Sequence, residues 1–193
     1  MANGQVTTGF SKPYVALYSA SNNTVTYTSG QALARGVEVS MEIETSEDND
    51  FYADNIVAES DSGSFVSGTL TLTVDGLLAA AEKLIMGLPT ADADGFMPYD
   101  DDQAIPDVGV GFIRRVMSGG VTSYIPYVFP RCTFQQIPVE AATQEAEIDW
   151  QTQELTANIQ RAEDAKRTWQ RVGTGETSEA AAEAKVKTAL NIQ

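Results

Sequence analysis

The stretch GVEVSMEIET (Gly36–Thr45) decides the fold, because its side chains alternate between apolar and polar. The apolar row holds Val37, Val39, Met41 and Ile43, and the polar row holds Glu38, Ser40, Glu42 and Glu44. A second run, SFVSGTLTLTVDG (Ser64–Gly76), sets leucine and valine against threonine. A period of two is typical of a strand with one buried face. The two runs therefore predict an antiparallel sheet that is wetted on one side.

Further strands are predicted on both sides of these runs. PYVALYS and TVTYTS flank Asn22-Asn23, which is a strand–turn–strand pattern. VGVGFIRRVM and VTSYIPYVFPRCTF are joined in the same way at Ser118-Gly119-Gly120. Pro126 and Pro130 have no amide hydrogen to donate, so we expect the second of these two segments at a sheet edge or a bend.

The segment TQEAEIDWQTQELTANIQ (Thr143–Gln160) repeats the opening pattern. Its apolar row includes Ala146, Ile148 and Trp150, and its acidic row holds Glu145, Glu147 and Asp149. The segment that follows, 161–172, fits two interpretations. Its residues favour a helix by propensity, whereas AEDAK also fits the turn of a hairpin.

Two helices are predicted. In LLAAAEKLIMG (Leu77–Gly87), four apolar residues at helical spacing are followed by a glycine at the C-terminal cap position. These residues are Leu77, Ala81, Leu84 and Ile85. The last stretch, SEAAAEAKVKTALNIQ, predicts a terminal helix with a Glu183–Lys187 pair at i,i+4. Its apolar stripe holds Ala182, Val186, Ala189 and Leu190.

The fold class predicted is mainly β, an antiparallel sandwich or open barrel with one flanking helix and a short C-terminal helix. Residues 1–13 are expected to be an N-terminal arm, 14–172 the β domain, and 173–193 a C-terminal arm with its helix. Residues 46–63 are expected to be a long solvent-exposed loop. We expect this loop to stay mobile until a partner covers its apolar side chains. These are Phe51, Tyr52, Ile56 and Val57.

The charge of the chain limits its partners. Twelve lysines and arginines against 27 acids give a net charge of −15, which opposes binding to a phosphate backbone. Between Glu38 and Asp107 the only base is Lys83, whereas five bases fall in the last 30 residues. An acidic body with a more basic C-terminus can attract other copies of itself.

The residues needed for most catalysis are absent from the sequence. There is no histidine, which excludes Ser/His/Asp and Cys/His systems, and no glycine-rich phosphate loop. Cys132 lies in PRCTF, where we interpret it as a small strand residue. Paired carboxylates of a glycosidase stay open as an alternative, although only Trp150 and Trp169 could form a sugar platform. We therefore expect no enzyme and no cofactor.

An acidic loop partly matches a calcium-binding pattern. In TADADGFMPYDD, Asp92, Asp94 and Gly95 fit positions three, five and six of an EF-hand loop, and Asp101 fits position twelve. Position one is threonine and position twelve lacks the usual glutamate. We expect no bound metal, with a structural cation in residues 90–102 left as the alternative.

Several features suggest where the protein is made. A single cysteine fits a reducing compartment, and no apolar run approaches the roughly 18 residues that span a bilayer. The first residues also lack the basic-then-apolar pattern of a secretion signal. We expect the protein to be made in the cytoplasm, with no membrane partner.

The order of these features resembles the major tail proteins of bacteriophages with long, flexible, non-contractile tails (siphophages). YADN (52–55) stands in a long acidic loop between GVEVSMEIE and FVSGTLTLTV, and a helix ending in LIMG follows. VGVGFIRRV, YVFPRCTF and ATQEAEIDWQTQELTANI then precede an alanine-rich terminal helix. The resemblance covers the chain from Pro13 onward. It also favours a hairpin over a helix for RTWQRV.

The resemblance implies a structural protein of the virion tail that is assembled in the cytoplasm of the host bacterium. Members of this family form hexameric rings that stack into a tube, and DNA passes through the tube without specific binding. Their other partners are the tape-measure, tail-terminator and distal tail proteins. The implied lining of the channel is Glu38, Glu42, Glu44, Glu145, Glu147 and Asp149. The implied contact between rings is Asp48, Asp50, Phe51, Tyr52, Asp54 and Asn55.

Two other functions stay open. One is an acidic β-sandwich that binds or adheres to a ligand as a monomer, and the other is a carbohydrate-active enzyme. In either case Glu38, Glu42 and Glu44 would only solvate an outer face of the sheet.

Overall fold

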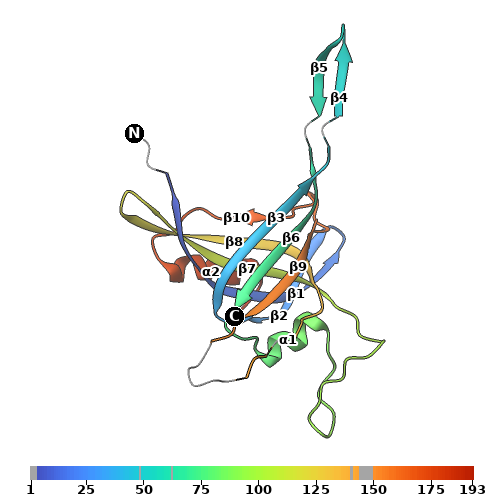
Figure 1. Ribbon diagram of the computed structural model, residues 1–193, viewed down its shortest axis with the longest axis vertical. Helices are drawn as coiled ribbons and strands as arrows, with labels where there is room; N and C mark the ends of the chain where they lie inside the picture. The colour runs from blue at the N-terminus through green and yellow to red at the C-terminus, as the bar shows by residue number, and fades with distance from the viewer. Residues whose placement is uncertain (1–3, 48, 62, 140, 144–149) are drawn as a thin grey trace.

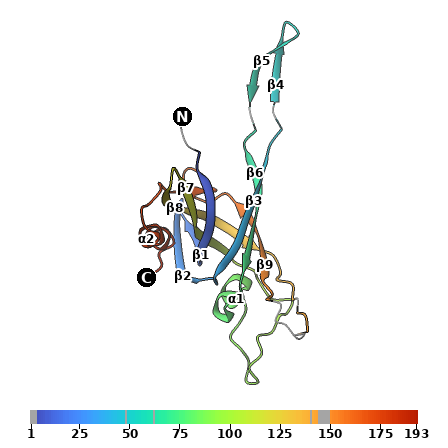
Figure 2. The ribbon, with the colours of Figure 1, turned by 60° about the vertical axis from the view of Figure 1, so that its left-hand side comes forward.

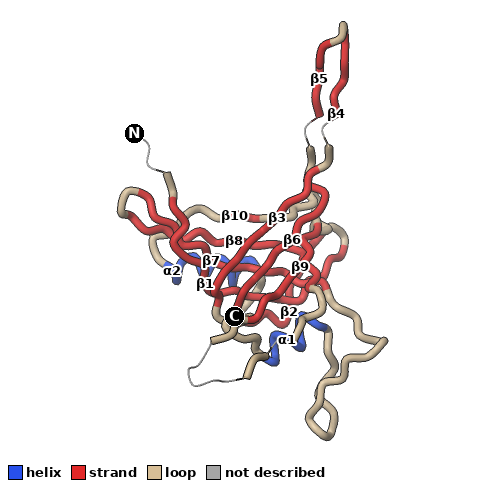
Figure 3. The backbone as a smooth tube through the Cα atoms, viewed as in Figure 1, coloured by secondary structure: helices blue, strands red, loops and turns tan. Residues whose placement is uncertain are grey.

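A computed structural model describes residues 4–47, 49–61, 63–139, 141–143 and 150–193 (Figure 1). Strands predominate in these ranges, with two short helices (Figure 3). The strands are β1 Val6–Ser21, β2 Thr24–Ala32, β3 Gly36–Thr45, β4 Asn49–Ala53, β5 Ile56–Asp61, β6 Phe65–Val74, β7 Asp107–Ser118, β8 Val121–Phe134, β9 Gln153–Gln160 and β10 Arg171–Val172. The helices are α1 Ala79–Met86 and α2 Glu179–Ala189. The prediction of a mainly β fold with two helices is confirmed.

One antiparallel sheet in the order β2-β1-β7-β8-β9-β6-β3 forms the body, and β10 pairs with β8. The sheet folds over, so that β3, β6 and β9 make one layer and β1, β2, β7 and β8 make the other (Figure 2). Gly36 at the start of β3 lies against the ring of Phe10 in β1, where an added Cβ would clash with that ring. β3 at one end of the sheet therefore lies close to β1 near the other end, and among the described residues no ladder joins them, so the sandwich is an open barrel.

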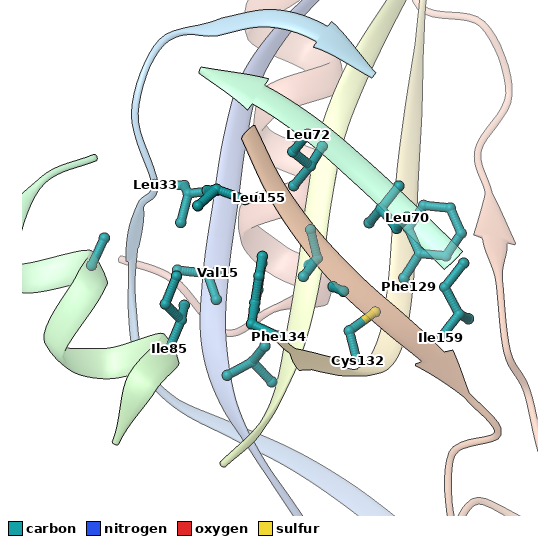
Figure 4. Packing of buried hydrophobic residues seen from close by; sticks show 14 of the residues in the cluster. Val15, Leu33, Leu70, Leu72, Ile85, Phe129, Cys132, Phe134, Leu155 and Ile159 are labelled. Carbon is teal, nitrogen blue, oxygen red and sulfur yellow. The ribbon is translucent and has the colours of Figure 1, made fainter. Parts of the chain in front are cut away.

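The core lies between the two layers (Figure 4). Alternate residues of each strand enter it, and α1 covers the end of the sandwich with Ala81, Ile85 and Met86 fully buried. Gly87 ends α1 in the left-handed conformation with φ 65°, as the sequence predicts. The largest fully buried core side chains are Leu33, Leu70, Leu72, Ile85, Met86, Phe129, Phe134, Leu155 and Ile159.

Helix α2 forms a third layer on the outer face of β1, β2, β7 and β8 (Figure 2). Val186 and Leu190 of its predicted stripe are fully buried. Two glycines of VGVGF let the helix come this close. A Cβ on Gly109 would lie 2.7 Å from Leu190, and one on Gly111 would lie 2.6 Å from Val186. The glycines of this strand therefore serve helix packing.

A group of charged residues fastens α2 to β1. The Glu183 carboxylate forms ion pairs with Lys12 and with Lys187, the latter at 3.2 Å, and accepts a hydrogen bond from the Tyr14 hydroxyl at 2.5 Å. The hydrogen bond from Lys12, followed by that from Tyr14, lowers the pKa of Glu183 from 4.5 to about 2. The lowered pKa means that the folded state favours the ionised carboxylate.

We predict that Glu183 stabilises the fold only while it is ionised. Its contribution should be complete above pH 4.5 and should be lost as the pH falls towards about 2. At pH 7, Glu183→Gln should lower the free energy of unfolding by about 1–2 kcal/mol. Urea unfolding of both proteins between pH 7 and pH 3 measures this difference, which should shrink below pH 4.5. The neighbouring Glu179→Gln serves as the control, and a constant difference across this range would contradict the prediction.

Two boundaries and the burial of one residue differ from the prediction. Residues 6–13, assigned to an arm, form the first half of β1 and pair with β7. Residues 46–63, assigned to a loop, contain the hairpin of β4 and β5, because left-handed Asp54 and Asn55 allow a tight turn. Val37, assigned to the core, occupies a β-bulge between Gly36 and Glu38 and is 54% exposed.

The sheet edge predicted for β8 is wrong, because β8 is a central strand, whereas the predicted bend agrees with a register shift between Phe129 and Cys132, beside Pro130. β8 pairs with β7 along one edge and with β10 and β9 along the other. β10 pairs at Tyr127 and Val128, and β9 pairs from Arg131 onward, so Pro130 falls in the gap where an amide hydrogen is not needed. A central strand tolerates the proline because its neighbour changes there.

In the C-terminal third, some predictions are wrong and one is confirmed in part. Trp150, assigned to the core, is 85% exposed and lies outside the strands, and the strand of this region begins at Gln153. Residues 144–149, with Ala146 and Ile148 of the same row, lie outside the described residues. A turn at Asp164–Arg167 reverses the chain, and Trp169 then stacks on Phe65 with ring centres 4.6 Å apart. The turn of the hairpin predicted in 161–172 is therefore confirmed. The strand after it, β10, pairs with β8 and not with β9.

Candidate functional site

The polar rows of β3, β6 and β9 combine into one continuous face, which we name the acidic face. The register sets Glu38 opposite Thr73 and Glu42 opposite Thr69, and β9 continues the same rows. Residues opposite each other in a ladder point to the same side of the sheet. The acidic face comprises Glu38, Ser40, Glu42, Glu44, Ser67, Thr69, Thr71, Thr73, Glu154, Thr156 and Asn158.

The other side of these three strands explains why the polar rows stay outside. Val39 is opposite Leu72, and Leu72 is opposite Leu155, so the apolar rows meet inside the sandwich. A shift of β3 by one residue would turn its carboxylates into this core. Burying an unpaired charge is very costly, so the register is strongly fixed.

The strands of the acidic face contribute only negative charge, but arginines from neighbouring segments border one end of it. Arg131, Arg161 and Arg167 line a hollow together with Glu44, Ser67, Thr69 and Asn158. β3, β6 and β9 contain no lysine or arginine, and the Glu44 carboxylate accepts a hydrogen bond from the Ser67 hydroxyl at 2.6 Å. Arg131 in β8 is the first base along the sheet, and it is already paired with Asp107 at 2.7 Å and Glu163 at 2.8 Å. The face therefore presents carboxylates and hydroxyls without a free cation on its own strands.

The outer edge of β3 is a second feature of this surface. Within the described part of the chain, β6 is the only strand that pairs with β3. Phe10 of β1 covers this edge at Gly36 and Gln170 lies against Met41, but the cover is incomplete, since Met41 is 39% exposed and Val37 in the bulge is 54% exposed. A long open edge with exposed apolar side chains is a template for pairing with another chain.

The hairpin of β4 and β5 is the third feature. It extends from β3 and β6 along the long axis of the molecule, at the end opposite α1 (Figure 1). Phe51 and Ile56 are 63% and 67% exposed on it. An isolated two-stranded hairpin is marginally stable in water, so a surface of this kind favours a partner.

The predicted site residues are only partly described. Glu38, Glu42 and Glu44 lie together on the acidic face, and Asp50, Phe51, Asp54 and Asn55 are exposed on the hairpin. Tyr52 belongs to β4. Asp48, Glu145, Glu147 and Asp149 lie outside the described residues.

Sequence reasoning missed the contribution of β9 to the acidic face. Glu154, Thr156 and Asn158 continue the polar rows of β3 and β6. The signal was present in QELTANIQ, where Glu, Thr and Asn alternate with Leu, Ala and Ile. It could have been found only by starting a new alternation at Gln153, because Glu154 has the same parity as Ala146, Ile148 and Trp150 of the predicted apolar row.

The acidic loop at 90–102 and Cys132 are the other candidate sites. In the described ranges, no three His, Cys, Asp or Glu residues lie close enough to hold a metal ion. The Asp92 carboxylate instead accepts the backbone amides of Asp94 and Phe96, at 3.0 and 2.9 Å. Cys132 is fully buried, and burial raises the pKa of its thiol, which makes it unreactive as a nucleophile.

Comparison with protein-family models and with curated proteins gives no match for this chain. In the part of the chain that the structure describes, neither helix has the length and hydropathy needed to cross a membrane. The function is therefore argued from the acidic face, the open edge of β3 and the hairpin.

Proposed function

We propose that this protein is a tail-tube subunit of a long-tailed, non-contractile bacteriophage, a structural protein without enzymatic activity. The acidic face on β3, β6 and β9 is the observation that carries the proposal. On a monomer, a wide surface of carboxylates and hydroxyls beside an open sheet edge has no evident use. On the wall of a channel for DNA, the same surface has a physical role.

The role is electrostatic. DNA carries one negative charge per about 1.7 Å of its axis. Carboxylates around a narrow channel concentrate negative potential, so the duplex is kept from adhering to the wall. Threonine and serine hydroxyls keep the rest of the wall wet and free of apolar contact. DNA therefore passes through without specific binding.

The open edge and the hairpin support assembly of such a channel. The outer edge of β3 is available for a neighbouring copy, which would extend the sheet and continue the acidic face around a ring. We propose six copies in the ring, as in the family that the sequence resembles. The hairpin, with arms of roughly eight residues, reaches about 25 Å beyond the sheet at 3.3 Å per residue. This length is enough to contact the next ring.

The proposed partners and location follow from this role. The protein binds other copies of itself in the ring and in the stack. The tape-measure protein, tail terminator and distal tail proteins are its further proposed partners. It is assembled in the cytoplasm of the host bacterium and resides in the tail of the virion.

The two alternatives receive less support from the same surface. A carbohydrate-active enzyme needs two carboxylates around a concave pocket, with aromatic platforms for the sugar. Glu38, Glu42 and Glu44 instead follow one strand, and their cross-strand partners are threonine and serine. An adhesion module would leave the edge of β3 unpaired and would remain monomeric.

Electron microscopy of the purified protein tests the proposal. Concentrated samples should contain hollow rings or stacked tubes. Sedimentation velocity should show that these species grow with protein concentration, because assembly follows mass action. Monomers at every concentration, together with binding to a sugar or protein ligand, would favour an alternative.

A further inference from the structure

A groove beside α2 has the properties that the hairpin of another copy requires. Two adjoining hollows of about 570 and 320 Å³ share Arg171, Thr188 and Ala189, and together they follow α2. The floor of the larger hollow is apolar. It is formed by Pro126, Val128, Val172, Gly173, Ala184 and Ala189. Val172 is 53% exposed, so apolar surface is open to a partner here.

The rim of this groove carries two bases and one acid, and one of the bases is unpaired in the described part of the chain. Arg171 and Lys185 line the larger hollow. Lys185 is paired with Glu176, whereas the guanidinium of Arg171 has no hydrogen-bond or ion-pair partner among the described residues. Asp164 in the smaller hollow uses its Oδ1 to hold the backbone amides of Lys166 and Thr168. Arg171 is thus a free cation beside an apolar floor.

The hairpin has the complementary composition. Residues 46–63 contain six acids and no base, and Glu47, Asp50, Asp54 and Glu59 are exposed. Phe51 and Ile56 supply exposed apolar surface between these acids. The hairpin and α2 belong to different parts of the molecule, so one chain cannot join them (Figure 2).

We infer that the hairpin of one copy docks in the groove beside α2 of a second copy, with its acids facing Arg171. The inference rests on the proposed function, to which it adds the receiving surface. Hairpin and groove are different surfaces, so a head-to-tail contact leaves one of each free on the outermost copies. It can therefore repeat along a stack.

The hollow beside α1 is the competing receiver. It is also apolar, with Leu17, Ala80, Leu84, Leu88 and Pro106 in its lining. Its base is Lys83, but α1 and the loop after it carry many acids. These are Glu82, Asp92, Asp94, Asp100, Asp101 and Asp102. Like charges would repel the acidic hairpin at this surface.

Site-directed cross-linking distinguishes the two receivers. Cys132 is fully buried, so exposed positions can be labelled selectively. One protein carries Ala53→Cys in the hairpin, and a second carries Ala184→Cys in the groove. Mixed with a short bismaleimide, they should give a link between positions 53 and 184, identified by mass spectrometry. Its yield should exceed that of the matched Ala53→Cys and Ala80→Cys mixture at least tenfold.

Charge reversal tests the chemistry of the same contact. Arg171→Glu in the groove protein should reduce the link roughly tenfold, with a weaker effect in high salt. Adding Glu59→Arg to the hairpin protein should restore it. Circular dichroism of each variant should match the parent, because every position changed is exposed.

The outcomes separate this inference from the proposed function. Tubes that form while the hairpin links to the Ala80→Cys protein, or to neither protein, would overturn the inference and leave the tail-tube proposal standing. Absence of both tubes and links at every concentration would overturn both. A link that Arg171→Glu leaves unchanged would also overturn the inferred contact.

Discussion

Replacing the hairpin segment Glu47–Gly63 with Asn-Gly is expected to give a folded subunit that forms no tubes. The backbone amide of Ser46 donates to the carbonyl of Ser64 at 2.9 Å, so these residues already form the last pair of the ladder. An Asn-Gly turn suits a two-residue connection between such a pair. None of the described residues of the excised segment belongs to the buried clusters of the body, so the melting temperature should change by only a few degrees.

Assembly should respond far more strongly than folding. If the hairpin joins consecutive rings, its removal takes away the contact along the tube and leaves only contacts within a ring. Microscopy should then show single rings or monomers, and sedimentation should show no growth into longer species. Tubes of normal length from this variant would show that the hairpin is not an assembly element.

A second turn of the same chain offers a matched control. Gly119 and Gly120 join β7 and β8 with φ of 56° and 82°, which is the geometry that Asn-Gly adopts. Gly119→Asn therefore places the same turn sequence in another hairpin. This variant should fold and form tubes like the parent. Failure of the control would assign the loss of tubes to the turn chemistry.

The parts of the fold that alternation governs could be predicted from sequence. β3 and β6 combine a buried apolar row with a wetted polar row, and this pattern fixes both the strand and its register. α2 was predictable for a similar reason, since Val186 and Leu190 recur on one face of a helix. In each case local pattern and tertiary packing require the same arrangement.

The errors occur where packing between distant segments decides. Nothing local shows that Val37 falls in a bulge, because the bulge arises where β3 begins its pairing with β6. Pro130 predicted an edge or a bend, but whether a central strand accepts proline there depends on which neighbours β8 has at that residue. The full extent of the acidic face could not be predicted for the same reason. Its rows come from three strands, and only the register of the sheet brings Glu154 into line with Glu38 through Thr73.

Changing Glu38, Glu42 and Glu44 together to lysine is expected to leave folding nearly intact and to impair DNA passage. All three side chains are exposed, and the hydrogen bond that would be lost is the one from Ser67 to Glu44. The free energy of unfolding should therefore fall by no more than about 1–2 kcal/mol. Tubes should assemble, because the change leaves the hairpin and α2 untouched.

The electrostatics of the channel should change sign locally. Each substitution replaces a negative side chain with a positive one, and the ring repeats this change in every copy. A wall of this kind attracts phosphates, and ejection should slow roughly tenfold or more at low ionic strength. The effect should weaken as salt rises, because the Debye length shortens from about 30 Å at 0.01 M to about 10 Å at 0.1 M. Timed DNA release from virions carrying the variant, measured across this salt range, tests the expectation.

The ejection experiment needs a control variant with the same change in net charge at another surface. Asp100, Asp101 and Asp102 are exposed in the loop after α1, so their joint change to lysine alters the net charge equally without touching the acidic face. Glu38, Glu42 and Glu44 changed to glutamine remove charge from the face without reversing it. Slow ejection should appear with the first lysine variant, be small with glutamine, and be absent with the loop variant. If all three eject at the parental rate at every salt concentration, the acidic face does not meet the DNA and lies on the outside of the assembly.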